Sequence, residues 1–158
     1  MSQLKIIALG SLGLFEANVK HLALNGYKPI LLIHPNDRDN SKLKKGLRSL
    51  EIETWETGDI ASLAPRLREF APDLMISMAY PEIYKKQIID IPRIGMFNLH
   101  CSHLPKGRGR HHLNWALIEG DLSVGVTTHL VDDKIDEGDI ILQDLVVVER
   151  DDDYASLR

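Results

Sequence analysis

Residues 4–33 read LKIIALGSLGLFEANVKHLALNGYKPILLI, and this stretch decides the fold. Leu4–Leu9 is a short apolar run that ends in a turn containing two glycines, Gly10 and Gly13. Residues 14–25 then carry apolar side chains at helical spacing, and Pro29–Ile33 is a second apolar run. A strand, a helix and a second strand in this order predict a parallel pair joined by a right-handed crossover.

The same alternation continues along the chain. Its spacing predicts strands at 51–55, 73–78 and 95–100, helices at 62–70, 83–89 and 112–119, and two final strands at 124–131 and 140–148. Turn signals between the last two strands favour a hairpin or a long loop over a helix. The pattern therefore predicts an α/β fold: a Rossmann-like, mostly parallel twisted sheet with helices on both faces and hairpin-like last strands.

Length and composition favour one globular domain over residues 1–158 and argue against several other classes. Cys101 is the only cysteine, so no disulfide can form within the chain, and a reducing compartment fits. The apolar run after Lys5 is broken by glycines and closed by Glu16, which favours a buried strand over a secretion signal. No apolar run approaches the length of a membrane span. We expect a cytoplasmic protein with no membrane partner, and the formal net charge of -4 gives no indication of a nucleic-acid partner.

The chain stops at DDDYASLR, residues 151–158. An acidic cluster before apolar residues is typical of a helix N-terminus. We therefore expect the natural protein to continue and the domain to be truncated at its C-terminal end.

The loop after the first strand allows three interpretations. Gly10 and Gly13 do not form the G-x-G-x-x-G pattern of dinucleotide-binding folds, and His34 stands where that fold places an acidic residue. The glycines could serve only a tight turn. Alternatively, the backbone N–H groups of the loop and the helix end could hold a substrate phosphate.

The densest polar region is residues 97–109, FNLHCSHLPKGRG. Asn98 and His100 are two positions apart at the end of a predicted strand, so both side chains project from one face. That end of a parallel strand borders the ligand crevice of an open α/β sheet. An amide can stabilise a developing oxyanion and an imidazole can move a proton, which suits acyl transfer. The alternative is that Asn98 caps a turn and His100 is a surface histidine.

A second polar segment, residues 132–140, reads DDKIDEGDI. Acidic residues around a glycine in a turn are usually just solvated. A carboxylate brought near His100 would instead orient its ring and raise its pKa.

These segments together resemble a known family. The pattern N-L-H-x-S-x-L-P-x-x-R-G at residues 98–109 is followed by N-W-A at 114–116, G-V-T at 125–127 and I-D-x-G-D-I at 135–140. In this order and spacing they are similar to the folate-dependent formyltransferase family. The resemblance covers nearly the whole chain and is closest from Asp73 onward.

The resemblance implies an enzyme that uses 10-formyltetrahydrofolate as formyl donor. Asn98, His100 and Asp136 match the family's catalytic residues; the first two would stabilise the tetrahedral oxyanion, and Asp136 would support the charged histidine. The positions matching the folate pocket are Met78, Tyr80, Glu82, Ile83, Tyr84, Val131, Asp132 and Asp133. The positions expected to contact the substrate are Gly10, Ser11, Ser102, Lys106, Arg108 and Gly109.

The resemblance implies that the formyl acceptor is a primary amine of a small molecule, and residues 105–115 look most like enzymes that formylate nucleotide-linked amino sugars. Methionyl-tRNA and glycinamide ribonucleotide are the alternatives. His103 and Gly107 depart from the family pattern, which affects the acceptor pocket more than the chemistry. Two other classes compete: a metal hydrolase, whose histidines lack ligand spacing and which we do not expect, and an inactive folate- or nucleotide-binding module.

Overall fold

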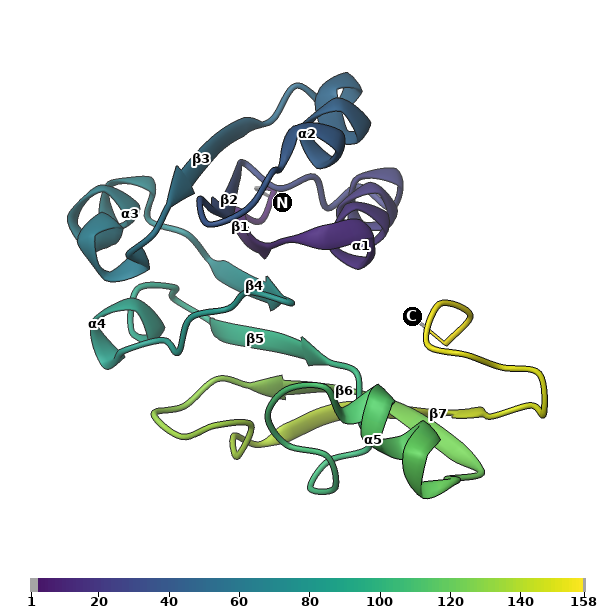
Figure 1. Ribbon diagram of the computed structural model, residues 1–158. Helices are drawn as coiled ribbons and strands as arrows, with labels where there is room; N and C mark the ends of the chain where they lie inside the picture. The colour runs from purple at the N-terminus through teal and green to yellow at the C-terminus, as the bar shows by residue number, and fades with distance from the viewer. Residues whose placement is uncertain (1–2, 158) are drawn as a thin grey trace. The chain divides into compact units, whose positions relative to one another are not determined.

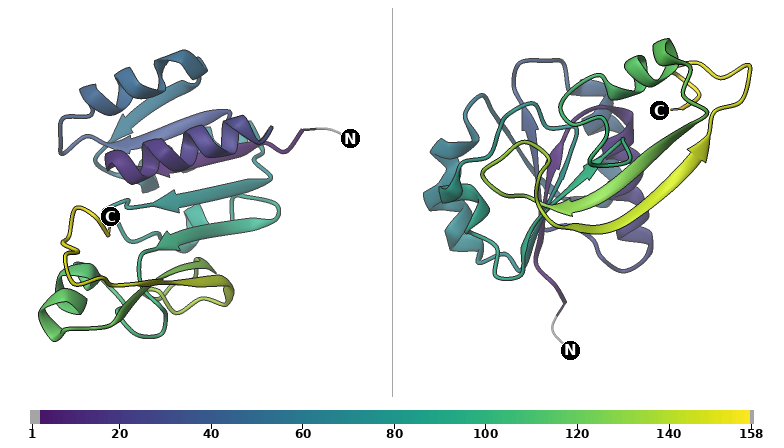
Figure 2. Two further views of the ribbon diagram at one scale, coloured as in Figure 1. Left: turned by 90° about the vertical axis from the view of Figure 1, so that its right-hand side faces the viewer. Right: turned by 90° about the horizontal axis from the view of Figure 1, so that it is seen from below.

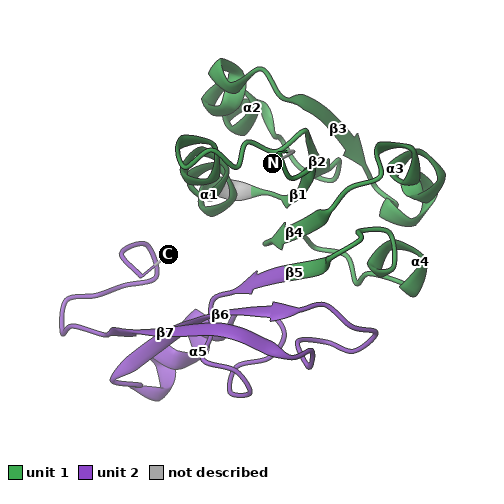
Figure 3. Cartoon of the chain, turned by 180° about the vertical axis from the view of Figure 1, so that it is seen from behind, with its two compact units in different colours: residues 1–97 green, residues 98–158 purple. Residues whose placement is uncertain are grey.

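The computed structural model describes residues 3–157 and divides into two compact units. Unit 1 comprises residues 1–97 and unit 2 residues 98–158 (Figure 3). Strand β5, Gly95–His100, passes from one into the other. None of the helices among the described residues has the length and apolar character needed to cross a bilayer.

Unit 1 is built on parallel strands in the order β3-β2-β1-β4. These are β1 (Ile6–Gly10), β2 (Leu31–Pro35), β3 (Glu53–Thr57) and β4 (Leu74–Met78). Every residue of β1 and β2 is buried, as expected for central strands that are covered on both faces. The two apolar runs that open the sequence are therefore the core of this unit.

Helices cover both faces of this sheet (Figures 1 and 2). On one face lie α1 (Leu12–Leu24) and α2 (Ser41–Leu47), which contact each other. On the other lie α3 (Ala64–Phe70) and the single-turn α4 (Lys86–Ile89). Short 3-10 turns at Arg48–Leu50 and Ile60–Leu63 precede β3 and α3.

Unit 2 contains the end of β5, helix α5 (His112–Glu119), and the antiparallel strands β6 (Ser123–Leu130) and β7 (Ile140–Val147). The loop at 131–139 joins β6 to β7. Its Gly138 lies so close to the Leu130 carbonyl that a Cβ there would overlap it, so the return of this loop requires glycine.

The predicted fold class is confirmed, since parallel strands alternate with helices and the last two strands form a hairpin. Two expected elements differ. The predicted helix over 83–89 is helical only at Lys86–Ile89, because Lys85 is extended and the Tyr84 hydroxyl is held by Ser77. The expected helix start near Asp151 is only a turn at 154–156, where the Asp153 carboxylate accepts hydrogen bonds from the next N–H groups.

Candidate active site

Strand β5 places the two predicted catalytic side chains on one face. Met96, Asn98 and His100 alternate with Phe97 and Leu99, as the pleat of a strand requires. Met96 is fully buried in unit 1, and the two polar residues that follow it belong to unit 2. His100 is itself buried, with an exposed fraction of 7%.

Asp136 is the third predicted residue, and the 131–139 loop brings it to the other two. Its Oδ2 lies 3.7 Å from His100 Nδ1 and accepts a hydrogen bond from the Gly109 N–H at 2.9 Å. Its Oδ1 lies 3.4 Å from Asn98 Nδ2. Asp136 adopts a left-handed backbone conformation with φ 51°, which aspartate tolerates better than most residues. The structure thus brings the three predicted catalytic side chains together within unit 2.

The hydrogen bonds of His100 define what each ring nitrogen can do. Nε2 lies 2.8 Å from the Gly107 carbonyl oxygen, which can only accept, so Nε2 carries a hydrogen. Nδ1 faces the Asp136 carboxylate and is the nitrogen that can gain or lose a proton. A proton on Nδ1 makes an imidazolium beside a carboxylate, an arrangement that suits a group poised to stabilise negative charge.

His129 belongs to the same cluster, although it was not among the predicted site residues. It is 2% exposed, its Nε2 lies 3.2 Å from Asn98 Nδ2 and 3.5 Å from Asp136 Oδ1, and its Nδ1 lies 2.8 Å from the Leu130 carbonyl. The signal was available, because Thr127 and His129 alternate on β6 as Asn98 and His100 do on β5.

The charge state of His129 decides which partner its Nε2 takes. In the neutral ring, Nδ1–H donates to Leu130 and Nε2 accepts from the Asn98 amide. In the cation, Nε2–H donates to Asp136, and the Asn98 N–H can no longer point at it. His129 therefore couples the orientation of the Asn98 amide to the charge around Asp136.

The pKa values of this pair are displaced in opposite directions. Burial lowers the pKa of His129, but its hydrogen bonds to Asp136 and the Leu130 carbonyl outweigh burial and raise the pKa overall. Burial raises the pKa of Asp136, but hydrogen bonds from His129 and the Gly109 N–H, with the nearby His100, lower it overall. The Asp136 carboxylate is therefore held in its charged form.

His112, at the start of α5, packs against His100. The ring centroids are 4.6 Å apart with an interplanar angle of 54°. Burial, followed by the nearby His100, lowers the pKa of His112 to about 4, so this ring is neutral at neutral pH. His112 therefore adds no positive charge beside His100 at neutral pH.

The predicted folate-binding residues fall in both units. In unit 1, Met78 and Tyr84 are buried and Ile83 is 65% exposed, while the Tyr80 hydroxyl donates to Glu82 Oε1 at 3.3 Å. Burial, then the nearby Glu82, raises the pKa of Tyr80. In unit 2, Val131, Asp132 and Asp133 begin the loop that carries Asp136, and Asp132 accepts from the Lys134 N–H at 3.0 Å. Their folate-binding role stays a prediction.

The predicted substrate contacts also divide between the units. In unit 1, Ser11 Oγ donates to the Ala79 carbonyl at 2.8 Å and accepts from Arg38 Nη1 at 3.3 Å; a Cβ at Gly10 would overlap the Phe15 ring. In unit 2, Lys106 pairs with Asp121 at 2.7 Å and Arg108 with Glu137 at 2.9 Å. The basic residues beside the site are therefore already ion-paired, and an anion would have to compete for them.

A metal centre has no support in the geometry of the described part of the chain. Between residues 3 and 157, no group of three or more histidine, cysteine, aspartate and glutamate side chains is arranged to hold a metal ion.

The geometry brings Asn98, His100, His129 and Asp136 into one polar cluster on a Rossmann-like fold, and comparison with known proteins gives the family. Residues 39–158 match the formyl transferase family model. The chain therefore belongs to the formyl transferase family, as the sequence resemblance predicted.

The relatives include methionyl-tRNA formyltransferases. Those of Caldanaerobacter subterraneus subsp. tengcongensis and Geobacter sulfurreducens are 29% and 30% identical to this chain, over 98% and 99% of its length. The chain spans about half the length of each, 53%. The crystal structure of glycinamide ribonucleotide transformylase 1 from Symbiobacterium toebii shares the fold, with a TM-score of 0.84, 24% identity, and coverage of 98% of this chain and 78% of that one.

Proposed function

We propose that residues 1–158 form a formyltransferase catalytic domain that transfers the formyl group of 10-formyltetrahydrofolate to a primary amine. The observation that carries the proposal is the environment of His100. Its Nε2 is fixed by the Gly107 carbonyl, its Nδ1 faces Asp136, and Asn98 lies in the same hydrogen-bonded cluster. This is an oxyanion-stabilising pair with a carboxylate behind it.

The steps follow from these positions. The acceptor amine attacks the formyl carbon, and the carbonyl oxygen becomes an oxyanion that the Asn98 amide and the His100 imidazolium stabilise. Collapse of the tetrahedral intermediate breaks the bond between the formyl carbon and the folate nitrogen. The proton lost by the amine passes to that nitrogen, with Asp136 supporting the charged His100 during the relay.

His129 acts as a positioning residue in this proposal. Because its Nε2 reaches both Asn98 and Asp136, it holds the amide that must face the developing charge. Its burial at 2% exposure keeps it from contacting bulk water, which favours a supporting role over a direct one.

The acceptor that we favour is a nucleotide-linked amino sugar, on the strength of residues 105–115. The relatives are named for methionyl-tRNA and for glycinamide ribonucleotide, which are the two alternative acceptors. Each of the three acceptors carries phosphate as well as the amine. In unit 1, Ser11 at the start of α1, with Arg38 beside it, is one place where such a phosphate can be held.

The test is a calorimetric titration with 5-formyltetrahydrofolate, a stable analogue of the donor, together with a formyl-transfer assay. We expect saturable binding that His100→Ala leaves within about threefold, while transfer falls about a thousandfold because a group acting in proton transfer and charge stabilisation is lost. Unchanged turnover in His100→Ala would contradict the proposal.

A second pair of variants tests His129. We expect His129→Leu to lower kcat about tenfold, with KM for the donor unchanged and a displaced pH profile, because leucine cannot accept a hydrogen bond from the Asn98 amide. The matched control is His21→Leu, which changes an exposed histidine on α1 and should leave all three parameters as they are. An equal loss in KM and kcat would indicate that His129 acts only on the structure of the unit.

A further inference from the structure

Gln143 stands apart from the rest of strand β7. Of the eight described residues of this strand, Ile140–Val147, seven are exposed and Gln143 alone is half-buried. In the β6–β7 register Gln143 lies directly opposite Thr127, so the two side chains project from the same face of the hairpin. The mechanism proposed above assigns no part to Gln143.

The Gln143 amide makes two hydrogen bonds toward the loop that follows β5. Its Nε2 donates to the Leu104 carbonyl at 2.8 Å and to Thr127 Oγ1 at 3.0 Å. A carbonyl oxygen can only accept, so the amide nitrogen and not the amide oxygen must face Leu104. Both N–H groups of the Gln143 side chain are therefore used in holding this loop.

The Thr127 hydroxyl depends on Gln143 for a full set of hydrogen bonds. Thr127 is 0% exposed, and its hydroxyl donates to the Ser102 carbonyl and accepts from the Leu104 N–H as well as from Gln143. One donor and two lone pairs are all that a hydroxyl offers. Without Gln143, a lone pair of Thr127 and the carbonyl of the buried Leu104 would both lose a partner, which is costly.

The same loop carries the carbonyl that orients the His100 ring. The Lys106 N–H donates to the His103 carbonyl at 3.1 Å, which closes a turn over residues 103–106. The next residue, Gly107, accepts a hydrogen bond from His100 Nε2 at 2.8 Å. A displacement at Leu104 therefore moves the turn, and with it the oxygen that fixes His100.

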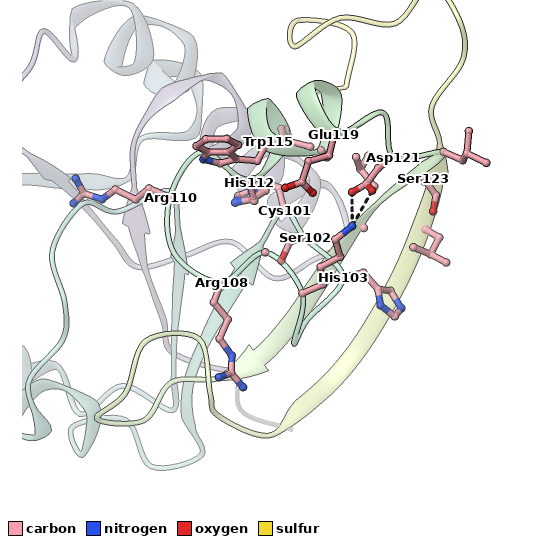
Figure 4. A pocket seen from close by; sticks show the side chains of 18 residues that line it. Cys101, Ser102, His103, Arg108, Arg110, His112, Trp115, Glu119, Asp121 and Ser123 are labelled. Atoms are coloured by element: carbon pink, nitrogen blue, oxygen red, sulfur yellow. Dashed lines mark hydrogen bonds and ion pairs between the residues drawn. The ribbon is translucent and has the colours of Figure 1, made fainter.

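Packing alone does not hold this loop in place. The loop borders a cavity of about 520 Å³ in unit 2, and Figure 4 shows Ser102 and His103 among the residues that line it. The loop backbone lies close to β6 at Gly125, where an added Cβ would be 2.7 Å from His103 Cα. Because empty space beside the loop lets it shift, the hydrogen bonds from Thr127 and Gln143 matter for its position.

Resting on the proposed function, we propose that Gln143 is a positioning residue for formyl transfer: from strand β7 it fixes the Gly107 carbonyl, and through this carbonyl the His100 ring. It acts through Thr127 and the backbone of the loop, and not on the substrate. A misplacement of a reacting group by about 1 Å can cost up to about a hundredfold in rate, so a residue outside the reacting cluster can control turnover.

The experiment compares variants of the 158-residue chain at two neighbouring positions of β7. Gln143→Met keeps the length of the side chain and removes both donors, so we expect kcat to fall about tenfold with KM for the formyl donor unchanged. Gln143→Asn keeps the two donors on a shorter side chain and should lose less, about threefold. The matched control is Leu142→Met, at a 67% exposed position, which should turn over as the parent does.

A second measurement reports on His100 without any need for turnover. NMR follows the exchange with water of the His100 Nε2–H, a signal assigned by its absence in His100→Ala. We expect this exchange to be about fivefold faster in Gln143→Met, because the hydrogen bond to the Gly107 carbonyl opens more often. The backbone N–H of Leu9, buried in β1, should exchange as in the parent, which a general loss of stability would not allow.

Three results overturn the inference: an unchanged kcat in Gln143→Met, an equal acceleration of exchange at Leu9 and His100, or an equal loss of turnover in Leu142→Met. The exchange measurement separates this inference from the proposed function. A parent chain that binds no folate and transfers no formyl group contradicts the proposed function, whereas faster exchange confined to His100 in Gln143→Met still supports the hold of Gln143 on that ring.

Discussion

The two units of the chain bury different kinds of side chain. Among the described residues, unit 1 buries nineteen apolar side chains against five polar ones, whereas unit 2 buries three apolar and four polar. In unit 1 the central strands are enclosed by helices, and their stability comes from apolar area removed from water.

Unit 2 is held by hydrogen bonds instead. The buried Thr127 hydroxyl donates to the Ser102 carbonyl at 2.6 Å and accepts from the Leu104 N–H at 3.2 Å and from Gln143 Nε2 at 3.0 Å. This one side chain fixes the loop that follows His100. The difference teaches that the apolar core and the polar cluster around His100 are carried by separate stretches of sequence.

The largest expected effect is on the stability of unit 1. Leu9, in β1, is completely buried, so Leu9→Ala should destabilise the protein by about 3 kcal/mol through lost transfer energy and the cavity left behind. Leu24→Ala, at an 86% exposed position of α1, should cost less than about 0.5 kcal/mol. Denaturant unfolding measures both. A Leu9→Ala protein with full stability but impaired formyl transfer would break the division between the units.

The next effect concerns acid. The pKa of His112 falls from 6.5 to about 4 in the folded protein, so between these values the unfolded chain binds a proton that the folded one does not. Stability should therefore fall as pH drops from about 6.5 to 4, by about 2 kcal/mol from this residue once solvent screening of the partly exposed ring is allowed for. His34, whose pKa burial also lowers, adds to the loss.

His112→Asn should remove its share of this acid sensitivity, so that the stability of the variant falls less than that of the parent between pH 6.5 and 4. The control His21→Asn alters an exposed histidine and should leave the slope with pH as it is. Parallel slopes for parent and His112→Asn would show that the ring is not held neutral.

The smallest effect sharpens the picture of the loop beside His100. Gly107 and Gly109 both have left-handed backbones, with φ 74° and 84°. Gly109→Ala meets nothing within 4 Å and should cost about 1 kcal/mol of backbone strain alone. Gly107→Ala must also displace Ser102 and His112, adding about 1 to 2 kcal/mol. Thermal unfolding gives the difference, and equal losses would show that the loop relaxes freely.

The sequence was informative where one physical cause dominates. Apolar runs predicted the buried strands of unit 1, because burial on both faces demands continuous apolar side chains. The helix at 83–89 was predicted too long because apolar spacing does not reveal that the backbone of Lys85 is extended, with φ −89° and ψ 155°.

The reactive centre was predictable in part. Asn98 and His100 follow from strand alternation, and Asp136 came from family resemblance. His129 could be placed on the inward face of β6 by strand alternation, but its contact with Asn98 could not, and His112 packs on His100 only because of how α5 returns, which no local pattern encodes. The ion pairs of Lys106 and Arg108 could not be predicted either, because their acidic partners lie far away in the sequence.

Strand β5 has a consequence for how this protein can evolve. Its odd and even positions serve different purposes, since Asn98 and His100 share a face and Phe97 and Leu99 the other. Deleting one residue of the strand upstream of Asn98 would turn Phe97 and Leu99 toward Asp136 and move Asn98 and His100 to the opposite face. Point substitutions can therefore tune this centre gradually, whereas length changes in β5 are all-or-none, and lineages should vary in length only in the loops on either side.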